Sequence, residues 1–145
     1  MTGAASGIGR ETALALARRG ADLAICDVDE AGLEETAEQI RQIGCRVLQS
    51  RVDVSSAEQM GGFAERTLAE LGRVDVLVNN AGAAPLLPID QTTDDVLLDA
   101  FKINAFAPIR LVALLWSTFH SRSGTGSSAS ISRESSTAAT SSFPR

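Results

Sequence analysis

The chain of 145 residues contains no tyrosine, and its only lysine is Lys102. It has no apolar run of about 18 residues, the length that a membrane-spanning helix needs. A basic segment followed by an apolar one, as in a secretory signal peptide, is missing from its beginning. We therefore expect a cytoplasmic protein that has no membrane partner.

Cysteine and positive charge are scarce as well. Cys26 and Cys45 fit no metal-site spacing, so no metal is expected, and buried free thiols in a reducing compartment are the simplest interpretation. The net charge of −5 argues against a nucleic-acid partner. With 44% hydrophobic and 21% charged residues, the composition is that of one globular domain.

The composition changes near Trp116. Serine occurs four times in residues 1–116 and eleven times in residues 117–145. We predict a folded domain over residues 1–116 and a disordered Ser/Thr-rich tail over residues 117–145, because the tail has too little apolar surface to offset the entropy of ordering. Two alternatives stay open: the tail orders on a partner, or it is the product of a shifted reading frame.

Short apolar segments alternate with amphipathic ones over residues 1–116. The pattern predicts strands over residues 21–27, 45–53 and 73–82, the last being the clearest. Helices are expected up to Gly20 and over residues 28–44, 55–72 and 92–116, and Pro108 should kink or divide the last of these. Strands separated by such helices indicate parallel βαβ units, and hence an α/β fold with helices on both faces of a sheet.

The stretch TGAASGIG, residues 2–9, is a glycine-rich turn in front of a helix. Glycines permit positive φ angles and let the main chain approach a pyrophosphate closely. The helix directs its N-terminal amides and the positive end of its dipole at such an anion. Turns of this kind also simply begin helices, so this motif alone leaves both interpretations open.

Asp27 ends the following predicted strand, 18 residues after Gly9. This is close to the spacing of about 20 residues expected for an acid that accepts the ribose hydroxyls of a dinucleotide. Its charge would repel a 2′-phosphate, and no basic residue lies within the turn, which favours NAD over NADP. The alternative is that Asp27 caps the next helix, or that Asp29 does so while Asp27 is solvated.

Polar residues also follow the two later strands. Asp53 and Val54 come where an adenine would lie, although Asp53 is equally suited to a turn. The stretch NNAG, residues 79–82, can bridge strands and flank a ribose, or be an ordinary polar loop. Asn104 stands in an apolar helix, where a buried amide needs a specific partner, unless it faces solvent.

Together these residues resemble the classical short-chain dehydrogenase/reductase family. The family's motifs are matched by the turn at residues 2–9, by Asp27 in its NAD-preferring members, by Asp53 with Val54, by NNAG at residues 79–82 and by Asn104. The resemblance implies a Rossmann-type doubly wound parallel sheet. It also implies hydride transfer between a nicotinamide and a carbonyl or secondary alcohol.

The resemblance further implies which residues would hold the cofactor. Those expected to bind NAD are Thr2, Gly3, Ser6, Gly7, Ile8, Gly9, Asp27, Asp53, Val54, Asn80, Ala81 and Gly82. Asn104 is the expected catalytic residue, because the family's asparagine helps to hold a water of the proton relay. The small-molecule substrate itself is not indicated.

The sequence departs from the family at both ends. Only Met1 precedes the turn, where family members have a central strand, and no Tyr-x-x-x-Lys or matching serine follows Asn104. The resemblance therefore implies an incomplete sheet. It leaves a catalytically inactive nucleotide-binding protein as the alternative to an oxidoreductase. The apolar segment over residues 96–116 is expected to lie at the subunit interface of a homo-oligomer.

Overall fold

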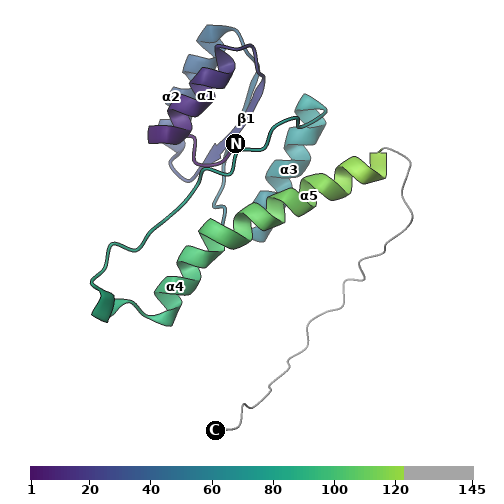
Figure 1. Cartoon of the computed structure of the whole chain (residues 1–145). Helices are drawn as coiled ribbons and strands as arrows, with labels where there is room; N and C mark the ends of the chain where they lie inside the picture. Colours follow the sequence, from purple (N-terminus) through teal and green to yellow (C-terminus); the bar gives the residue numbers. More distant parts are fainter. Residues whose placement is uncertain (123–145) are drawn as a thin grey trace.

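The computed structural model describes residues 1–122 as an α/β arrangement built around two parallel strands (Figure 1). Strand β1, Leu23–Asp27, pairs with strand β2, Val47–Arg51, with Leu23 opposite Val47. Both strands lie within the ranges that the apolar runs predicted. The α/β class with parallel pairing is therefore confirmed.

Helices lie on both faces of this pair. The α-helices are α1 Gly7–Ala17, α2 Glu30–Ile43, α3 Ala57–Leu71, α4 Asp94–Phe101 and α5 Ala107–Arg122. A short 3-10 helix, Ile89–Gln91, precedes α4, and a π-helix, Lys102–Phe106, joins α4 to α5. Helices α1 and α2 pack together on one side of the strands, and α3 and α5 pack together on the other (Figure 1).

Local sequence determines where several of these helices begin and end. The Ser56 hydroxyl oxygen caps α3 by accepting from the Gln59 amide at 3.3 Å, and Thr93 caps α4 by accepting from the Val96 amide at 3.4 Å. Such side chains satisfy amides that the first turn leaves without a helical partner. Helix α2 ends at Gly44, whose φ of 98° is a conformation that favours glycine.

The buried apolar side chains form two separate clusters, one on each face of the strands. The cluster beneath α1 and α2 includes Leu14, Ile25, Leu33 and Ile40. The cluster beneath α3 and α5 includes Cys26, Met60, Phe63 and Leu111. Ile25 and Cys26 are neighbours in β1 and belong to different clusters, because successive strand residues point to opposite faces.

The strand predicted over residues 73–82 is not formed, so that prediction was wrong. Asn79 alone in this segment pairs, through an isolated parallel bridge to Thr2, and Thr2 makes a second parallel bridge to Cys26. Thr2 thus stands between β1 and the segment. An extended apolar segment becomes a strand only where a neighbour takes up its main-chain hydrogen bonds. The apolar pattern indicated burial and could not reveal whether a neighbour is present.

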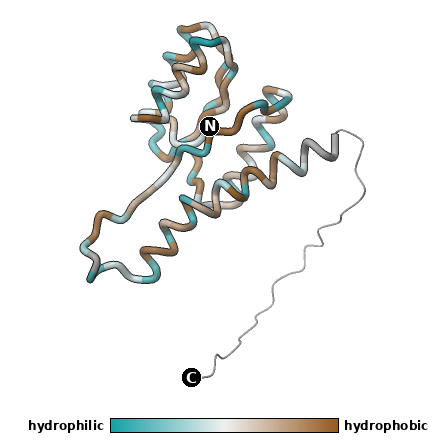
Figure 2. Tube along the Cα trace, in the orientation of Figure 1, coloured by the Kyte–Doolittle hydropathy of each residue, from teal (hydrophilic) through white to brown (hydrophobic). Residues whose placement is uncertain are grey.

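A cavity of about 450 Å³ separates β1 from this segment. Leu23 and Ala24 line one side, residues 74–78 line the other, and Phe63 and Leu111 border it from the face of α3 and α5. Residues 76–78, the sequence Val-Leu-Val, are a hydrophobic stretch of the tube in Figure 2. The cavity does not reach the glycine-rich turn, since none of residues 2–9 borders it.

The helix predicted over residues 92–116 is divided just before Pro108, as expected. In the π-helix the Ala107 amide donates to the Lys102 carbonyl, five residues back rather than four. Proline has no amide hydrogen, and its ring would collide with the carbonyl four residues earlier in a regular α-helix. The wider turn relieves that collision, which accounts for a π segment at this position.

Helix α5 continues to Arg122, past the domain boundary predicted at residue 116. The remainder of the predicted tail, residues 123–145, lies outside the described residues. Among the helices of residues 1–122, none combines the length and hydrophobicity needed to cross a bilayer.

Candidate functional site

The turn at residues 2–9 is closed on one side and open on the other. A Cβ atom on Gly9 would lie 1.7 Å from the Gly3 carbonyl oxygen, and one on Gly3 would lie 2.8 Å from the Asn80 side-chain nitrogen. Neither position can carry a side chain. Gly7 has a φ of 52°, and a Cβ there would meet no atom within 4 Å. The turn therefore presents bare main chain to open space at Gly7.

Asn80 fixes the turn to the segment after α3. Its side-chain amide nitrogen donates to the Gly3 carbonyl at 2.9 Å and to the Thr2 carbonyl at 3.2 Å. In return, the Thr2 hydroxyl oxygen accepts from the main-chain amides of Asn80 at 3.1 Å and Ala81 at 3.0 Å. Of the two interpretations of NNAG, the structure shows the bridging one.

The N-terminus of α1 faces outward from the turn. Ser6, Gly7 and Ile8 are exposed, and Ile8 retains 80% of its accessible surface. The first turn of α1 contains no acidic residue, and the Ser6 side chain makes no capping hydrogen bond. The first amides of a helix have no helical partner and carry the positive end of its dipole. This end of α1 is thus able to receive an anion.

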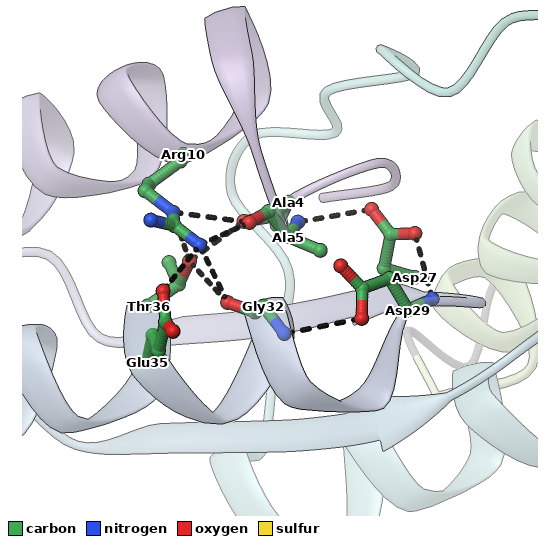
Figure 3. Close-up of polar contacts among 8 residues, drawn as sticks. All are labelled: Ala4, Ala5, Arg10, Asp27, Asp29, Gly32, Glu35 and Thr36. Atoms are coloured by element: carbon green, nitrogen blue, oxygen red, sulfur yellow. Dashed lines mark hydrogen bonds and ion pairs between the residues drawn. The ribbon is translucent and has the colours of Figure 1, made fainter.

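Asp27 lies directly beside the turn (Figure 3). Its Oδ2 accepts from the Ala5 amide at 2.9 Å, and its Oδ1 accepts from the Val28 amide at 2.7 Å and from the Asp29 amide at 3.2 Å. Asp29 is the residue that caps α2, since its Oδ1 accepts from the Gly32 amide at 3.2 Å. Asp27 is half-buried, so it neither caps the helix nor lies free in solvent.

Asp53 and Val54 stand at the end of β2, close to Asp27. The Val52 amide donates to the Asp27 carbonyl at 2.8 Å and brings the two strand ends together. The Asp53 carboxylate accepts from the Ser55 amide at 2.8 Å, which is the turn geometry considered as its alternative role. Val54 is buried and packs in the cluster that contains Cys26.

Asn104 lies in the π-helix next to the NNAG segment. Its Oδ1 accepts from the Ala83 amide at 2.9 Å, and its Nδ2 donates to the Ala83 carbonyl at 2.6 Å. The residue is exposed, yet its amide is hydrogen-bonded to one specific main-chain partner. Lys102, on the same segment, forms an exposed ion pair with Asp99 at 2.8 Å.

Cys26 is the ionisable side chain buried beneath the turn. Its carbonyl accepts from the Gly3 amide at 2.8 Å and from the Ala4 amide at 3.2 Å, while its thiol is fully buried. Burial raises the pKa of the Cys26 thiol to about 12. The thiol therefore stays neutral and acts as part of the core. No cluster of three metal-ligating side chains is found in residues 1–122.

Sequence reasoning missed three residues that hold the turn: Arg10, Gly32 and Thr36. Arg10 and Thr36 make hydrogen bonds to carbonyls of the turn, and Gly32 permits α2 to approach it. Weak signals existed. Gly32 is a glycine inside a helix, which is unfavourable unless close packing requires it. Thr36 is a polar residue within the apolar stripe of α2.

The sequence of this chain matches a known protein family. The family model described as "short chain dehydrogenase" matches residues 1–145. The chain belongs to the short-chain dehydrogenase family. The resemblance of its motifs is thereby confirmed.

Several known proteins are similar in sequence to this chain over part of their own length. "Probable oxidoreductase EphD" of Mycobacterium tuberculosis is 54% identical over 82 residues, which cover 57% of this chain and 14% of that protein. The 7alpha-hydroxysteroid dehydrogenase of Escherichia coli K12 is 32% identical over 115 residues, covering 79% and 45%. Human estradiol 17-beta-dehydrogenase 11 is 37% identical over 107 residues, covering 74% and 36%. The chain thus spans less than half the length of these relatives.

Solved structures agree on the fold. An alcohol dehydrogenase of Thermococcus sibiricus in complex with 5-hydroxy-NADP superposes with a TM-score of 0.76 at 31% identity, over 82% of this chain and 51% of that one. An NAD+-bound xylitol dehydrogenase superposes with a TM-score of 0.77 at 27% identity, over 83% and 47%. These relatives of the short-chain dehydrogenase family bind nicotinamide dinucleotides of both kinds.

Proposed function

We propose that this short-chain dehydrogenase chain binds NAD across the turn at residues 2–9. The observation that carries the proposal is the shape of the turn: side chains are excluded at Gly3 and Gly9, while Gly7 presents open main chain. Such a cradle fits a pyrophosphate, which the amides around Ser6, Gly7 and Ile8 at the N-terminus of α1 would hold. Thr2 supports the same turn through its hydroxyl.

Asp27 would select NAD over NADP. Its carboxylate lies beside the turn, and after the three amides are satisfied one of its about four lone-pair positions remains, on Oδ2, to accept from a ribose hydroxyl. A 2′-phosphate would bring a second negative charge to this carboxylate. Relatives are seen with either cofactor, so the preference rests on Asp27 itself.

The remaining residues would flank the two ends of the dinucleotide. Asp53 and Val54, beside the end of β1, would border the adenine. Asn80, Ala81 and Gly82 would border the nicotinamide side, because Asn80 ties their segment to the turn. Asn104 would be the catalytic residue nearest this end, since its amide holds Ala83.

The reaction proposed from the family is oxidoreduction. Bound NAD+ would accept a hydride from the carbon of a secondary alcohol, and bound NADH would supply one to the carbon of a carbonyl. This chain's residues would bind and orient the dinucleotide. A second candidate is a dinucleotide-binding protein without turnover, which the absence of tyrosine favours, since no residue of the 145 supplies the phenol that the family resemblance implies as acid and base.

Calorimetric titration of the 145-residue polypeptide with NAD and with NADP tests the proposal. We expect NAD to bind at least about tenfold more tightly than NADP, because a hydrogen bond to a charged group contributes about 1.5–3 kcal/mol. Asp27→Asn should remove most of that preference. Asp29→Asn is the matched control: it removes a neighbouring charge but keeps an equivalent helix cap, so the preference should persist.

Absence of binding by both dinucleotides would contradict the proposal as a whole. If the Asp27→Asn variant preferred NAD over NADP as strongly as the unchanged protein does, the proposed role of Asp27 would be contradicted. A spectrophotometric assay of NADH oxidation with carbonyl substrates separates the two candidate functions. Binding without turnover is the result expected for this polypeptide.

We also propose that the chain self-associates through the apolar surface of α4 and α5. Ile109, Val112 and Trp116 are each more than half exposed, and their spacing places them on one side of α5. Phe101 lies at the end of α4 and is 57% exposed. Exposed apolar side chains of this kind are typical of an interface between protein molecules.

A further inference from the structure

Arg10 reaches from the first helix, α1, to the second, α2, behind the glycine-rich turn (Figure 3). Its Nε donates to the Ala5 carbonyl and to the Thr36 hydroxyl oxygen, both at 3.0 Å, and its Nη2 donates to the Ala5 carbonyl and to the Gly32 carbonyl. The guanidinium also forms an ion pair with Glu35 at 3.0 Å. Its side chain is three-quarters buried, and these contacts engage Nε and Nη2.

The Ala5 carbonyl and the Ser6 amide belong to one peptide group. Every peptide bond in residues 1–122 is trans, so the two groups point in opposite directions. By drawing the Ala5 oxygen toward α2, Arg10 turns the Ser6 amide toward the open side of the turn. The preceding peptide group, between Ala4 and Ala5, is oriented in the same way. The Thr36 hydroxyl donates to the Ala4 carbonyl oxygen at 2.9 Å, and the Ala5 amide donates to Asp27 on the opposite side.

The approach of α2 leaves little freedom for this arrangement to relax. A Cβ atom on Gly32 would lie 2.8 Å from the Ala5 carbonyl oxygen and 2.6 Å from Oδ2 of Asp29. The two main chains thus meet almost directly. Arg10 supplies the hydrogen-bond donors at this junction, and a planar guanidinium can engage several acceptors at once.

We propose that Arg10 is a positioning residue for the anion-binding turn. It holds the Ala5 carbonyl against α2 so that the Ser6 amide faces the pyrophosphate, and it does not touch the dinucleotide itself. The proposal rests on the proposed binding of NAD at this turn. It distinguishes Arg10 from a cation that attracts phosphate directly, because its charge is paired with Glu35 and directed toward α2.

Ligand dissection tests this role. Dissociation constants for NAD, ADP-ribose and adenosine would be measured calorimetrically on the 145-residue chain and its variants. Arg10→Gln should weaken the binding of NAD and of ADP-ribose by about tenfold or more. It should weaken the binding of adenosine by less than about twofold, because adenosine has no pyrophosphate to present to the Ser6 amide. Arg10→Lys should lose nearly as much, since one ammonium cannot span the three acceptors.

Two matched controls remove charge without removing the carbonyl contacts. Glu35→Gln eliminates the ion pair but leaves the hydrogen bonds of Arg10 to the turn. Arg19→Gln removes an exposed cation just beyond the end of α1, where it donates to the Ala15 carbonyl. Both variants should bind NAD within about twofold of the unchanged protein, because each leaves the hydrogen bonds of Arg10 to the Ala5 and Gly32 carbonyls in place.

Several outcomes would overturn the proposal. Full affinity in Arg10→Lys together with loss in Arg10→Gln would identify attraction by charge rather than positioning. Equal weakening of adenosine and NAD would identify a purely structural role. If the unchanged protein bound no NAD, the proposed function itself would fail, and that result is visible without any variant.

One measurement needs no folded variant. Inorganic pyrophosphate would be titrated into the unchanged, isotope-labelled protein while the amide resonances of residues 5–9 are followed by NMR. The Ser6 amide should move most, because the Arg10 contact directs it to the open side. A Ser6 amide that does not respond while its neighbours do would contradict the proposed orientation.

Discussion

Single residues around the turn divide into those that contact open space and those that are sealed in the core. Cys26 belongs to the second group. It is fully buried in β1, and burial raises the pKa of its thiol to about 12. Cys45 is half-buried, and its thiol donates to the Ala17 carbonyl at 3.2 Å. The two thiols should therefore differ sharply in reactivity.

We predict that iodoacetamide at pH 8 modifies Cys45 in the native protein and leaves Cys26 unmodified. Only the thiolate is nucleophilic, and Cys26 has neither the charge nor the access. Mass spectrometry of digested samples would identify the alkylated residue. Unfolding in denaturant is the control and should expose both thiols. Modification of Cys26 at the rate of Cys45 in the native state would contradict its burial.

The raised pKa of Cys26 also predicts that the folded chain loses stability at high pH. Cys26 binds its proton more tightly in the folded chain than in the unfolded chain, whose thiol ionises near its ordinary pKa of 9.0. The stabilisation is complete below that unfolded value and declines as the pH rises through it toward about 12. Cys26→Ala should flatten this decline in urea unfolding experiments.

Individual residues were predictable where a motif imposes them. Asp27 and Asn80 stand in sequence patterns whose chemistry is explicit, and the structure brings both to the turn. Arg10 carried no comparable signal, because an arginine on a helix is ordinarily a solvated residue. Its role depends on the closeness of α2 to the turn, a tertiary property that no local pattern contains.

Among the helices, α3 contains a pair of glycines that the fold does not require. Gly62 is exposed, and a Cβ atom there would meet no atom within 4 Å. Gly62→Ala should raise the free energy of unfolding by about 0.5–1 kcal/mol, because alanine loses less backbone entropy in a helix interior. Urea unfolding followed by circular dichroism would measure the change.

Gly32 in α2 provides the matched comparison. It too lies inside a helix, yet its Cβ would collide with the Ala5 carbonyl and with Asp29. Gly32→Ala should therefore destabilise the protein despite the same gain in helix propensity. If Gly62→Ala were destabilising, an unseen contact of α3 would have to be invoked.

Elements were predictable to the extent that their partners are local. Helix caps follow from nearby residues. The strands β1 and β2 follow from apolar runs, and they formed within the predicted ranges. The segment 73–82 has the strongest strand pattern but only the bridge at Asn79. Main-chain pairing depends on a neighbour from elsewhere in the chain, so hydrophobicity alone could not predict it.

At the scale of the whole molecule, the surface of α4 and α5 determines how the chain behaves in solution. We expect a concentration-dependent increase in mass by analytical ultracentrifugation. Ile109→Glu should shift the protein toward monomer, because it places a charge where apolar contact is proposed. Ile43→Glu, on α2, is the control and should leave the association unchanged. Monomeric behaviour of the unchanged protein at all concentrations would contradict the proposal.

The two apolar clusters have a consequence for how the fold opens. They are joined by β1 and β2, by Thr2, and by the segment at Leu77 and Val78, whose side chains pack against different clusters. We therefore expect two cooperative unfolding units that meet along this shared layer. Main-chain amides of β1 should exchange with solvent only when both units open, whereas those of α3 and α5 report on one unit alone. The turn is tied to both units, to one through Arg10 and α2 and to the other through Asn80, so the opening of either unit should disturb its geometry.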